Sequence, residues 1–205
     1  MNNLFEKDEV SERDVAIFRR LLINLGLDIA LTEPVLDWLD KDVDARFENG
    51  FGAEDDEYMG YEVPYRTPNG PMSSPSELLL VKGFNLNIFQ TLQPYITTLP
   101  TRTAINVNTA SAVLISALNE NITVADGETI VTLREEGSFD DVNKFLQQDI
   151  IKAQNLPADG LDIKTNYFLL DAFARYGERG RGKLYSVLYR DGGRVDVVMR
   201  AQEVY

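Results

Sequence analysis

The sequence predicts an α+β protein in which an N-terminal helix packs against an antiparallel sheet and a large all-helical domain is inserted between the two. Three observations lead to this prediction. Apolar side chains recur at helical spacing in residues 10–25, short helical segments fill residues 76–156, and the C-terminal residues alternate with the period of β-strands. An isolated three-stranded sheet has an apolar face that needs a cover, and the N-terminal helix is the economical cover.

The first helix is predicted to begin after Ser11 and to stop at Gly26. Ser11 is a favoured N-cap residue, and Asp14 follows it at capping-box spacing. The apolar stripe of this helix consists of Val15, Phe18, Leu22 and Leu25. Such a stripe usually packs in the core of a protein.

The rest of the chain divides into loop, helical block and strands. Thr32 is predicted to cap a second helix, and residues 41–75 are predicted to be mostly loop because turn residues are frequent and periodicity is weak. Short helices are predicted at 76–81, 87–92, 109–118, 126–136 and 140–148. Strands are predicted at 166–176, 183–190 and 194–200, and Asp191-Gly192-Gly193 is a strong hairpin turn. The predicted segments are therefore 1–62, 63–163 (the inserted helical domain) and 164–205.

The composition excludes several classes of function. Cys and His are both absent, which excludes disulfides, thiol catalysis, Ser-His-Asp catalysis and most transition-metal sites. The formal charge is 20 − 33 = −13, which opposes binding to a phosphate backbone. No catalytic motif is present, so we predict that the protein is not an enzyme. The composition does not exclude a binding site for a hard cation with oxygen ligands.

Nine acidic and two basic residues lie between Asp37 and Glu57. Asp40, Asp42 and Asp44 alternate on a stretch predicted to be irregular, which directs carboxylates toward one point and suits Ca²⁺. The spacing is not that of an EF-hand, and the missing acidic ligands could come from Glu54-Asp55-Asp56-Glu57. From spacing alone, a metal site and a solvated acidic loop are both open. A pair of carboxylates acting in glycoside hydrolysis is disfavoured, because many acids cluster here rather than two isolated ones.

A series of motifs in fixed order resembles a known family over roughly residues 10–200. The motifs are Asp37-Trp38-Leu39-Asp40-Lys41-Asp42, Gly52-Ala53-Glu54-Asp55 with Tyr58, Pro64-Tyr65 with Asn69, Glu77-Leu78 with Val81 and Gly83, Leu92-Gln93-Pro94-Tyr95 with Leu99-Pro100, and Ile105-Asn106-Val107-Asn108-Thr109-Ala110. Each motif is weak alone, and together they are specific. The series resembles the GspK (XcpX-like) minor pseudopilin family of the bacterial type II secretion system.

The resemblance implies a pilin-like scaffold carrying a large helical insertion, in a non-enzymatic structural subunit. It implies a place at the tip of the pseudopilus, where the subunit initiates or caps assembly and supports protein secretion. The implied partners are the other minor pseudopilins (the I and J components), the H component and secreted cargo. For the stripe of Val15, Phe18, Leu22 and Leu25, the resemblance implies contact with a partner helix as the alternative to the core, so these four residues are candidate interface residues. The implied location is the bacterial periplasm, with the full-length protein anchored in the inner membrane by an N-terminal helix that is absent from this chain.

The resemblance also implies structural Ca²⁺, as one or two ions. Carried onto this chain, the matched positions Asp40, Asp42, Glu54 and Asp55 are the implied ligands. Asp44 is added from spacing only. Asp37 is predicted to cap or orient the local helix end rather than to bind the metal.

A nucleic-acid-binding protein is the alternative function. Residues 105–110 also resemble the opening of helix-hairpin-helix repeats that bind DNA, and residues 129–139 resemble the second helix and exit of such repeats. Those repeats place a Gly-x-Gly hairpin between their helices so that backbone N–H groups reach phosphates. Residues 119–128 are longer and acidic and lack the pair of glycines. We therefore expect the helical framework without binding to nucleic acid.

Overall fold

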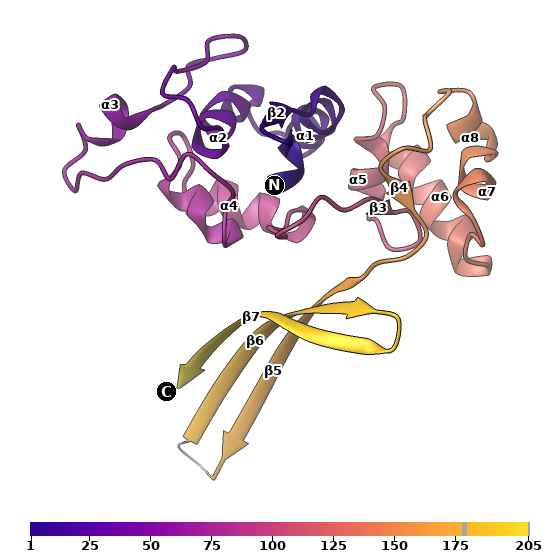
Figure 1. Cartoon of the computed structure of the whole chain (residues 1–205). Helices are drawn as coiled ribbons and strands as arrows, with labels where there is room; N and C mark the ends of the chain where they lie inside the picture. Colours follow the sequence, from indigo (N-terminus) through magenta and orange to yellow (C-terminus); the bar gives the residue numbers. More distant parts are fainter. Residues whose placement is uncertain (178–179, 205) are drawn as a thin grey trace. The chain divides into compact units, whose positions relative to one another are not determined.

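The computed structural model describes residues 1–177 and 180–204, which form two compact units, Met1–Ile163 and Lys164–Tyr205 (Figure 1). The first unit is mostly helical and the second is a sheet, so the predicted α+β class is confirmed. The pilin-like scaffold and the predicted division of the first unit at residue 62 stay predictions. In the described residues, no helix is both long enough and apolar enough to cross a membrane.

In its described residues, the first unit consists of helices and four strands of two residues each. In chain order its elements are η1 (Asn2–Leu4), β1 (Phe5–Glu6), β2 (Glu9–Val10), α1 (Glu12–Asn24), η2 (Ile29–Leu31), α2 (Thr32–Leu39), α3 (Asp55–Tyr58), η3 (Pro75–Leu80), α4 (Leu86–Leu92), η4 (Gln93–Tyr95), β3 (Ile105–Asn106), α5 (Ala112–Ser116), α6 (Val124–Glu136), α7 (Val142–Leu146), α8 (Asp149–Lys152) and β4 (Leu161–Asp162).

Helix α1 begins and ends as predicted. The Ser11 hydroxyl accepts a hydrogen bond from the Asp14 amide and donates one to the Asp14 carboxylate. Gly26 follows the helix with φ at +69°, a conformation that glycine adopts without strain. Arg20 on this helix donates to the carbonyls of Ala117 and Leu118, just beyond the C-terminus of α5, and thereby joins two segments far apart in sequence.

The apolar stripe of α1 is part of the hydrophobic core of the first unit. Val15, Phe18 and Leu22 are buried and Leu25 is partly buried, because α1 packs against α2, α5, η1 and η2. The interpretation of these four residues as a partner interface is therefore corrected, since the chain's own helices cover the stripe. The apolar stripe of an amphipathic helix indicates that the helix packs against something, but it does not indicate which element that is.

Helices α5 and α6 cross closely because α6 has a glycine at the contact. A Cβ atom at Gly127 would lie 2.3 Å from the Ala112 carbonyl oxygen, well inside van der Waals distance. Strands β3 and β4 pair in parallel, with Ile105 opposite Leu161, and so bring together the two ends of the segment that holds α5 to α8. Figure 1 shows β3 and β4 beside α5 and α6.

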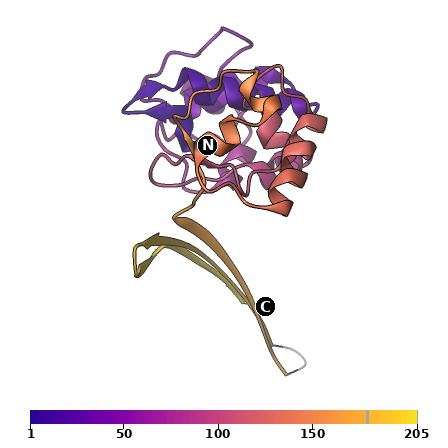
Figure 2. The ribbon, with the colours of Figure 1, turned by 90° about the vertical axis from the view of Figure 1, so that its right-hand side faces the viewer.

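The second unit is an antiparallel sheet of three strands, β5 (Tyr167–Tyr176), β6 (Gly180–Asp191) and β7 (Arg194–Val204), in the order β5-β6-β7. The predicted meander is confirmed. Asp191 pairs with Arg194 across a two-residue turn in which Gly192 has φ at +57°. Figure 2 shows the sheet as one curved layer, which reflects the usual strand twist. Apolar side chains on it are exposed, among them Leu169, Phe173 and Val195.

Several predicted helix boundaries are wrong by a few residues. The segment predicted at 109–118 is shorter because Ser111, rather than Asn108 or Thr109, caps α5. Thr32 lies inside the first turn of α2 rather than at its N-cap, and residues 75–80 form a 3₁₀ helix. Helix α8 and the pairings of β1 with β2 and of β3 with β4 were not predicted, because segments of two to four residues carry almost no periodic signal.

Candidate metal centre

Asp37 organises the loop that follows α2. Its carboxylate is fully buried and accepts hydrogen bonds from the backbone amides of Ala53, at 2.7 Å, and Arg46, at 3.2 Å. Gly52 makes this approach feasible, because a Cβ atom there would lie 1.9 Å from Asp37 Oδ2. Burial raises the pKa of Asp37 to about 6, although the two backbone hydrogen bonds oppose that rise. Asp37 therefore ties both ends of the 46–53 segment to the end of α2.

Three of the predicted ligands come together. Oxygen atoms of Asp40, Asp42 and Glu54 lie within 4.8 Å of one another. Asp40 follows the last residue of α2, Asp42 lies in the loop and Glu54 precedes α3, so the anchoring by Asp37 brings the three together. Asp40 and Glu54 are only 5% and 6% exposed, and Asp42 is exposed to solvent.

The two buried carboxylates each have one oxygen without a hydrogen-bond partner in the described chain. These atoms are Asp40 Oδ1 and Glu54 Oε1. The other oxygen of Asp40 accepts from Arg46 Nη2 at 3.0 Å, and the other oxygen of Glu54 accepts from the Thr67 hydroxyl at 3.4 Å. A buried carboxylate oxygen with no partner is costly, so both atoms point to an absent binding partner.

The raised pKa values in the cluster indicate that a positive charge beside these carboxylates would stabilise them. Burial raises the pKa of Glu54 to about 7, and the nearby carboxylates of Asp37 and Asp40 add to this rise. The pKa of Asp40 is also raised, first by burial, while its hydrogen bond with Arg46 opposes the rise. Arg46 is the cation that contacts Asp40, with a second and longer ion pair to Asp37 at 3.5 Å.

The remaining two predicted ligands lie outside this group. The Asp55 carboxylate accepts from the backbone amide and hydroxyl of Thr67, at 3.0 and 3.1 Å, and is also 3.4 Å from Arg66. Asp44 is exposed, and its backbone amide donates to Asp42 Oδ1 at 3.0 Å. Asp55 thus ties down a neighbouring loop and Asp44 orients Asp42.

The sequence did not indicate the supporting roles of Asn69 and Thr67. The Asn69 side-chain amide donates to the Asp42 carbonyl at 2.8 Å, and its own Oδ1 is buried without a partner in the described chain. Asn69 has φ at +45°, a left-handed conformation that asparagine tolerates better than most residues. The signals at this position were the place of Asn69 in the motif series and the Asn69-Gly70 dipeptide, which indicates a turn, and neither indicates a contact with Asp42.

The donor set fits a hard cation. All candidate ligand atoms are carboxylate oxygens, and oxygen is the ligand atom that the hard cations Ca²⁺ and Mg²⁺ prefer. Two ligands on opposite sides of a Ca²⁺ ion lie about 4.6–5.2 Å apart, given Ca–O distances of about 2.3–2.6 Å. The three candidate oxygens lie within 4.8 Å of one another, so a single ion of this kind could contact all three carboxylates.

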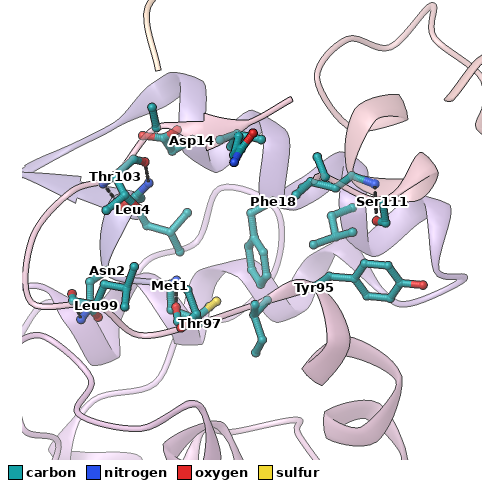
Figure 3. Close-up of a pocket in the computed structure, with 18 of the residues that line it drawn as sticks. Met1, Asn2, Leu4, Asp14, Phe18, Tyr95, Thr97, Leu99, Thr103 and Ser111 are labelled. Atoms are coloured by element: carbon teal, nitrogen blue, oxygen red, sulfur yellow. Dashed lines mark hydrogen bonds between the residues drawn. The ribbon is translucent and has the colours of Figure 1, made fainter. Parts of the chain in front are cut away.

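A separate cavity of about 390 Å³ lies between the N-terminal segment, α1 and the residues that precede α5 (Figure 3). Asp14 is the one carboxylate among its lining residues, and it is paired with Arg102 at 3.0 Å and with the Ser11 hydroxyl. Phe18, Tyr95 and Leu4 supply apolar walls, as Figure 3 shows. Within the described chain, this cavity presents no pair of free acid and base groups.

The N-terminus of α6 is closed by its own side chains. The Thr123 hydroxyl accepts from the Asp126 amide at 3.1 Å, and the Asp126 carboxylate accepts from the Thr123 amide at 2.8 Å. Hydrogen bonds from Thr123 lower the pKa of Asp126, so a negative charge already occupies this helix N-terminus, which would otherwise attract a phosphate. This geometry opposes the nucleic-acid alternative.

Comparisons with known proteins agree with the motif series. Two family models described as type II secretion system (T2SS), protein K match residues 1–101 and 105–164. A protein named type II secretion system protein K from Pectobacterium carotovorum subsp. carotovorum is 33% identical over 196 residues, which cover 90% of this chain and 58% of the relative. Its counterpart from Pseudomonas aeruginosa strain PAO1 is 34% identical over 208 residues, which cover 98% of this chain and 60% of the relative.

The chain therefore spans less than two thirds of the length of these relatives. A solved structure has the same fold. It is a chain in the crystal structure of the GspK-GspI-GspJ complex from the enterotoxigenic Escherichia coli type 2 secretion system, with a TM-score of 0.77 and 22% identity. The match covers 98% of this chain and 74% of that chain.

Proposed function

The chain belongs to the type II secretion system protein K family, and we propose that it is part of a minor pseudopilin, a non-enzymatic subunit that supports protein secretion. The observation that carries the proposal is the pair of family models, which together account for residues 1–101 and 105–164. The fold shared with a chain of a GspK-GspI-GspJ complex supports assembly with the I and J components. The H component and secreted cargo are further proposed partners.

We place the subunit at the tip of the pseudopilus in the periplasm, where it initiates or caps assembly. An N-terminal helix outside these 205 residues would anchor the whole protein in the inner membrane. The exposed apolar side chains of the β5-β6-β7 sheet support this proposal, because such a sheet face ordinarily packs against a helix.

The proposed function is tested in the organism that encodes the whole protein. We expect that deleting its gene abolishes release of type II secreted proteins into the medium and that the whole gene restores release. The whole protein should also co-purify with the I and J pseudopilins in detergent. Normal secretion in the deletion strain, or a salt-sensitive complex of the chain with duplex DNA, would favour a different function.

We propose that the group formed by Asp40, Asp42 and Glu54 binds a structural Ca²⁺ ion. Its support is the convergence of three carboxylates, two of which hold buried oxygen atoms without a partner in the described chain. The ion would neutralise the mutual repulsion of these groups and hold the end of α2, the loop and the start of α3 together. With Asp44 and Asp55 outside the group, its donor set suits one ion rather than two.

Ca²⁺ is expected to stabilise the chain against thermal unfolding, and Mg²⁺ much less. At a free concentration of one hundred times Kd, the gain is about 2.7 kcal/mol over the value in chelator. Glu54→Gln should remove most of this gain, because it removes one charged ligand. Asp44→Asn is the matched control, since Asp44 lies outside the group, and it should keep the gain. Equal melting temperatures in Ca²⁺ and chelator, or a normal response of the Glu54→Gln variant, would refute the assignment.

A further inference from the structure

Two phenylalanines project into solvent from the loop between Lys41 and Gly52. The side chains of Phe47 and Phe51 are 68% and 74% exposed, and their rings contact each other edge to face with centroids 6.0 Å apart. Val43 in the same loop is 69% exposed. Single exposed apolar residues are ordinary on a protein surface, but two exposed aromatic rings in mutual contact form a patch of a kind that marks interaction sites.

The backbone that carries this pair is held at both ends. Asp37 binds the amides of Arg46 and Ala53, which flank the pair, and the Gly52 amide donates to the Arg46 carbonyl at 2.8 Å. Gly50 lies so close to Ala30 that an added Cβ atom would be 2.9 Å from the Ala30 methyl group. A loop fixed in this way loses little further conformational entropy when a partner binds to it.

The acidic residues of the same loop and the net charge of the first unit select the chemistry of that partner. Asp42, Asp44 and Glu48 are exposed acidic residues of the same loop. The first unit as a whole has 12 basic and 28 acidic residues in Met1–Ile163, a net charge of −16. An anionic membrane surface is repelled by such a field, whereas a protein surface that carries Lys or Arg is attracted.

We propose that Val43, Phe47 and Phe51 form a docking site for a protein segment that combines apolar side chains with flanking Lys or Arg. The two rings are the apolar anchors that enter the partner, and the acidic residues form a charged rim that orients it. The site is independent of the assignment of the chain as a minor pseudopilin, because it rests on exposure, anchoring and charge alone.

Binding of synthetic peptides by fluorescence anisotropy, in Ca²⁺-containing buffer, tests the proposal. The probes are a peptide of alternating Lys and Leu-rich segments, a peptide in which Ser replaces each Leu, and a peptide in which Glu replaces each Lys. The first peptide should bind at least about tenfold more tightly than the other two. The Phe47→Ser/Phe51→Ser variant should lose that preference. Leu86→Ser is the matched control, because Leu86 is 58% exposed on α4, and should bind as the unmodified chain does.

Three results would overturn the proposal. The Ser-containing and Leu-containing peptides could bind equally, which would indicate attraction by charge alone. The Phe47→Ser/Phe51→Ser variant could bind the Lys-Leu peptide as well as the unmodified chain does. The unmodified chain could bind anionic phosphatidylglycerol vesicles in a manner that requires Phe47 and Phe51, which would assign the pair to a membrane. Urea unfolding followed by Trp38 fluorescence confirms that the variants are folded.

Discussion

Replacement of Gly127 by valine is expected to lower the free energy of unfolding of the first unit by about 3 kcal/mol, at the upper end of typical overpacking costs. Gly127 is buried inside α6, where α5 crosses it. The nearest atoms to an added Cβ would be the carbonyl oxygen, carbonyl carbon and Cα of Ala112, at 2.3, 2.9 and 3.0 Å. Because all three are backbone atoms, the helices must move apart to admit a side chain. That cost outweighs the gain of about 1 kcal/mol from removing a helical glycine.

Urea unfolding followed by tryptophan fluorescence measures this effect in the first unit. The chain has one tryptophan, Trp38, which is buried in α2. Gly137→Ala is the matched control, because an added Cβ there meets nothing within 4 Å and the backbone of Gly137 is extended. The control should change the stability by less than about 0.5 kcal/mol. Coincident urea midpoints for the Gly127→Val variant and the unmodified chain would show that α5 and α6 leave room for a side chain at residue 127.

Replacement of Arg19 by methionine is expected to cost about 3–5 kcal/mol, because it strands a buried charge. Glu33 in the first turn of α2 is fully buried, and its Oε1 atom accepts from Arg19 Nη2 at 3.0 Å and from the Asn49 amide at 3.4 Å. Its second oxygen has no partner in the described chain. Removing Arg19 therefore leaves a buried carboxylate with one weak hydrogen bond, from Asn49.

The double variant Arg19→Met/Glu33→Met separates loss of the pair from loss of one partner. Buried ion pairs are often replaced by apolar residues at little net cost, so the second substitution should recover most of the stability that the first one loses. Arg66→Met is the comparison on the surface, because the ion pair of Arg66 with Asp55 is largely exposed and should contribute less than about 1 kcal/mol. If Arg19→Met lowers the free energy of unfolding no more than Arg66→Met does, burial of Glu33 does not depend on its ion pair with Arg19.

Periodicity and turn chemistry were sufficient to predict the elements that are long or sharply bounded. The β5-β6-β7 meander, α1 with its Ser11 cap, and α6 were predicted because each has a regular pattern or a defined end. The packing partner of α1 was not predictable, since Val15 and Leu22 look the same whether a sheet or α5 covers them. The short pairing of Ile105 with Leu161 depends on tertiary contacts that no local pattern encodes.

The candidate site was predicted in its composition but not in its geometry. Alternation along the chain placed Asp40, Asp42 and Asp44 together, yet only the first two join Glu54. The difference arises from Asp37, whose buried carboxylate fixes the path of the loop through backbone amides that sequence spacing does not reveal. Arg46 likewise supplies positive charge to Asp40 from a position that reads as an ordinary surface residue in the sequence.

The raised pKa of Glu54, about 7, links the acidic cluster to the acidity of the medium. In the absence of an ion, the folded chain retains a proton on this carboxyl that the unfolded chain releases near its ordinary pKa of 4.5, so folding stability declines as the pH rises between those two values. A cation that occupies the cluster needs the carboxylate and therefore displaces the proton into solvent. Binding of the proposed cation would therefore weaken as the surroundings become acidic, so that one loop would couple the uptake of a metal ion to the release of a proton.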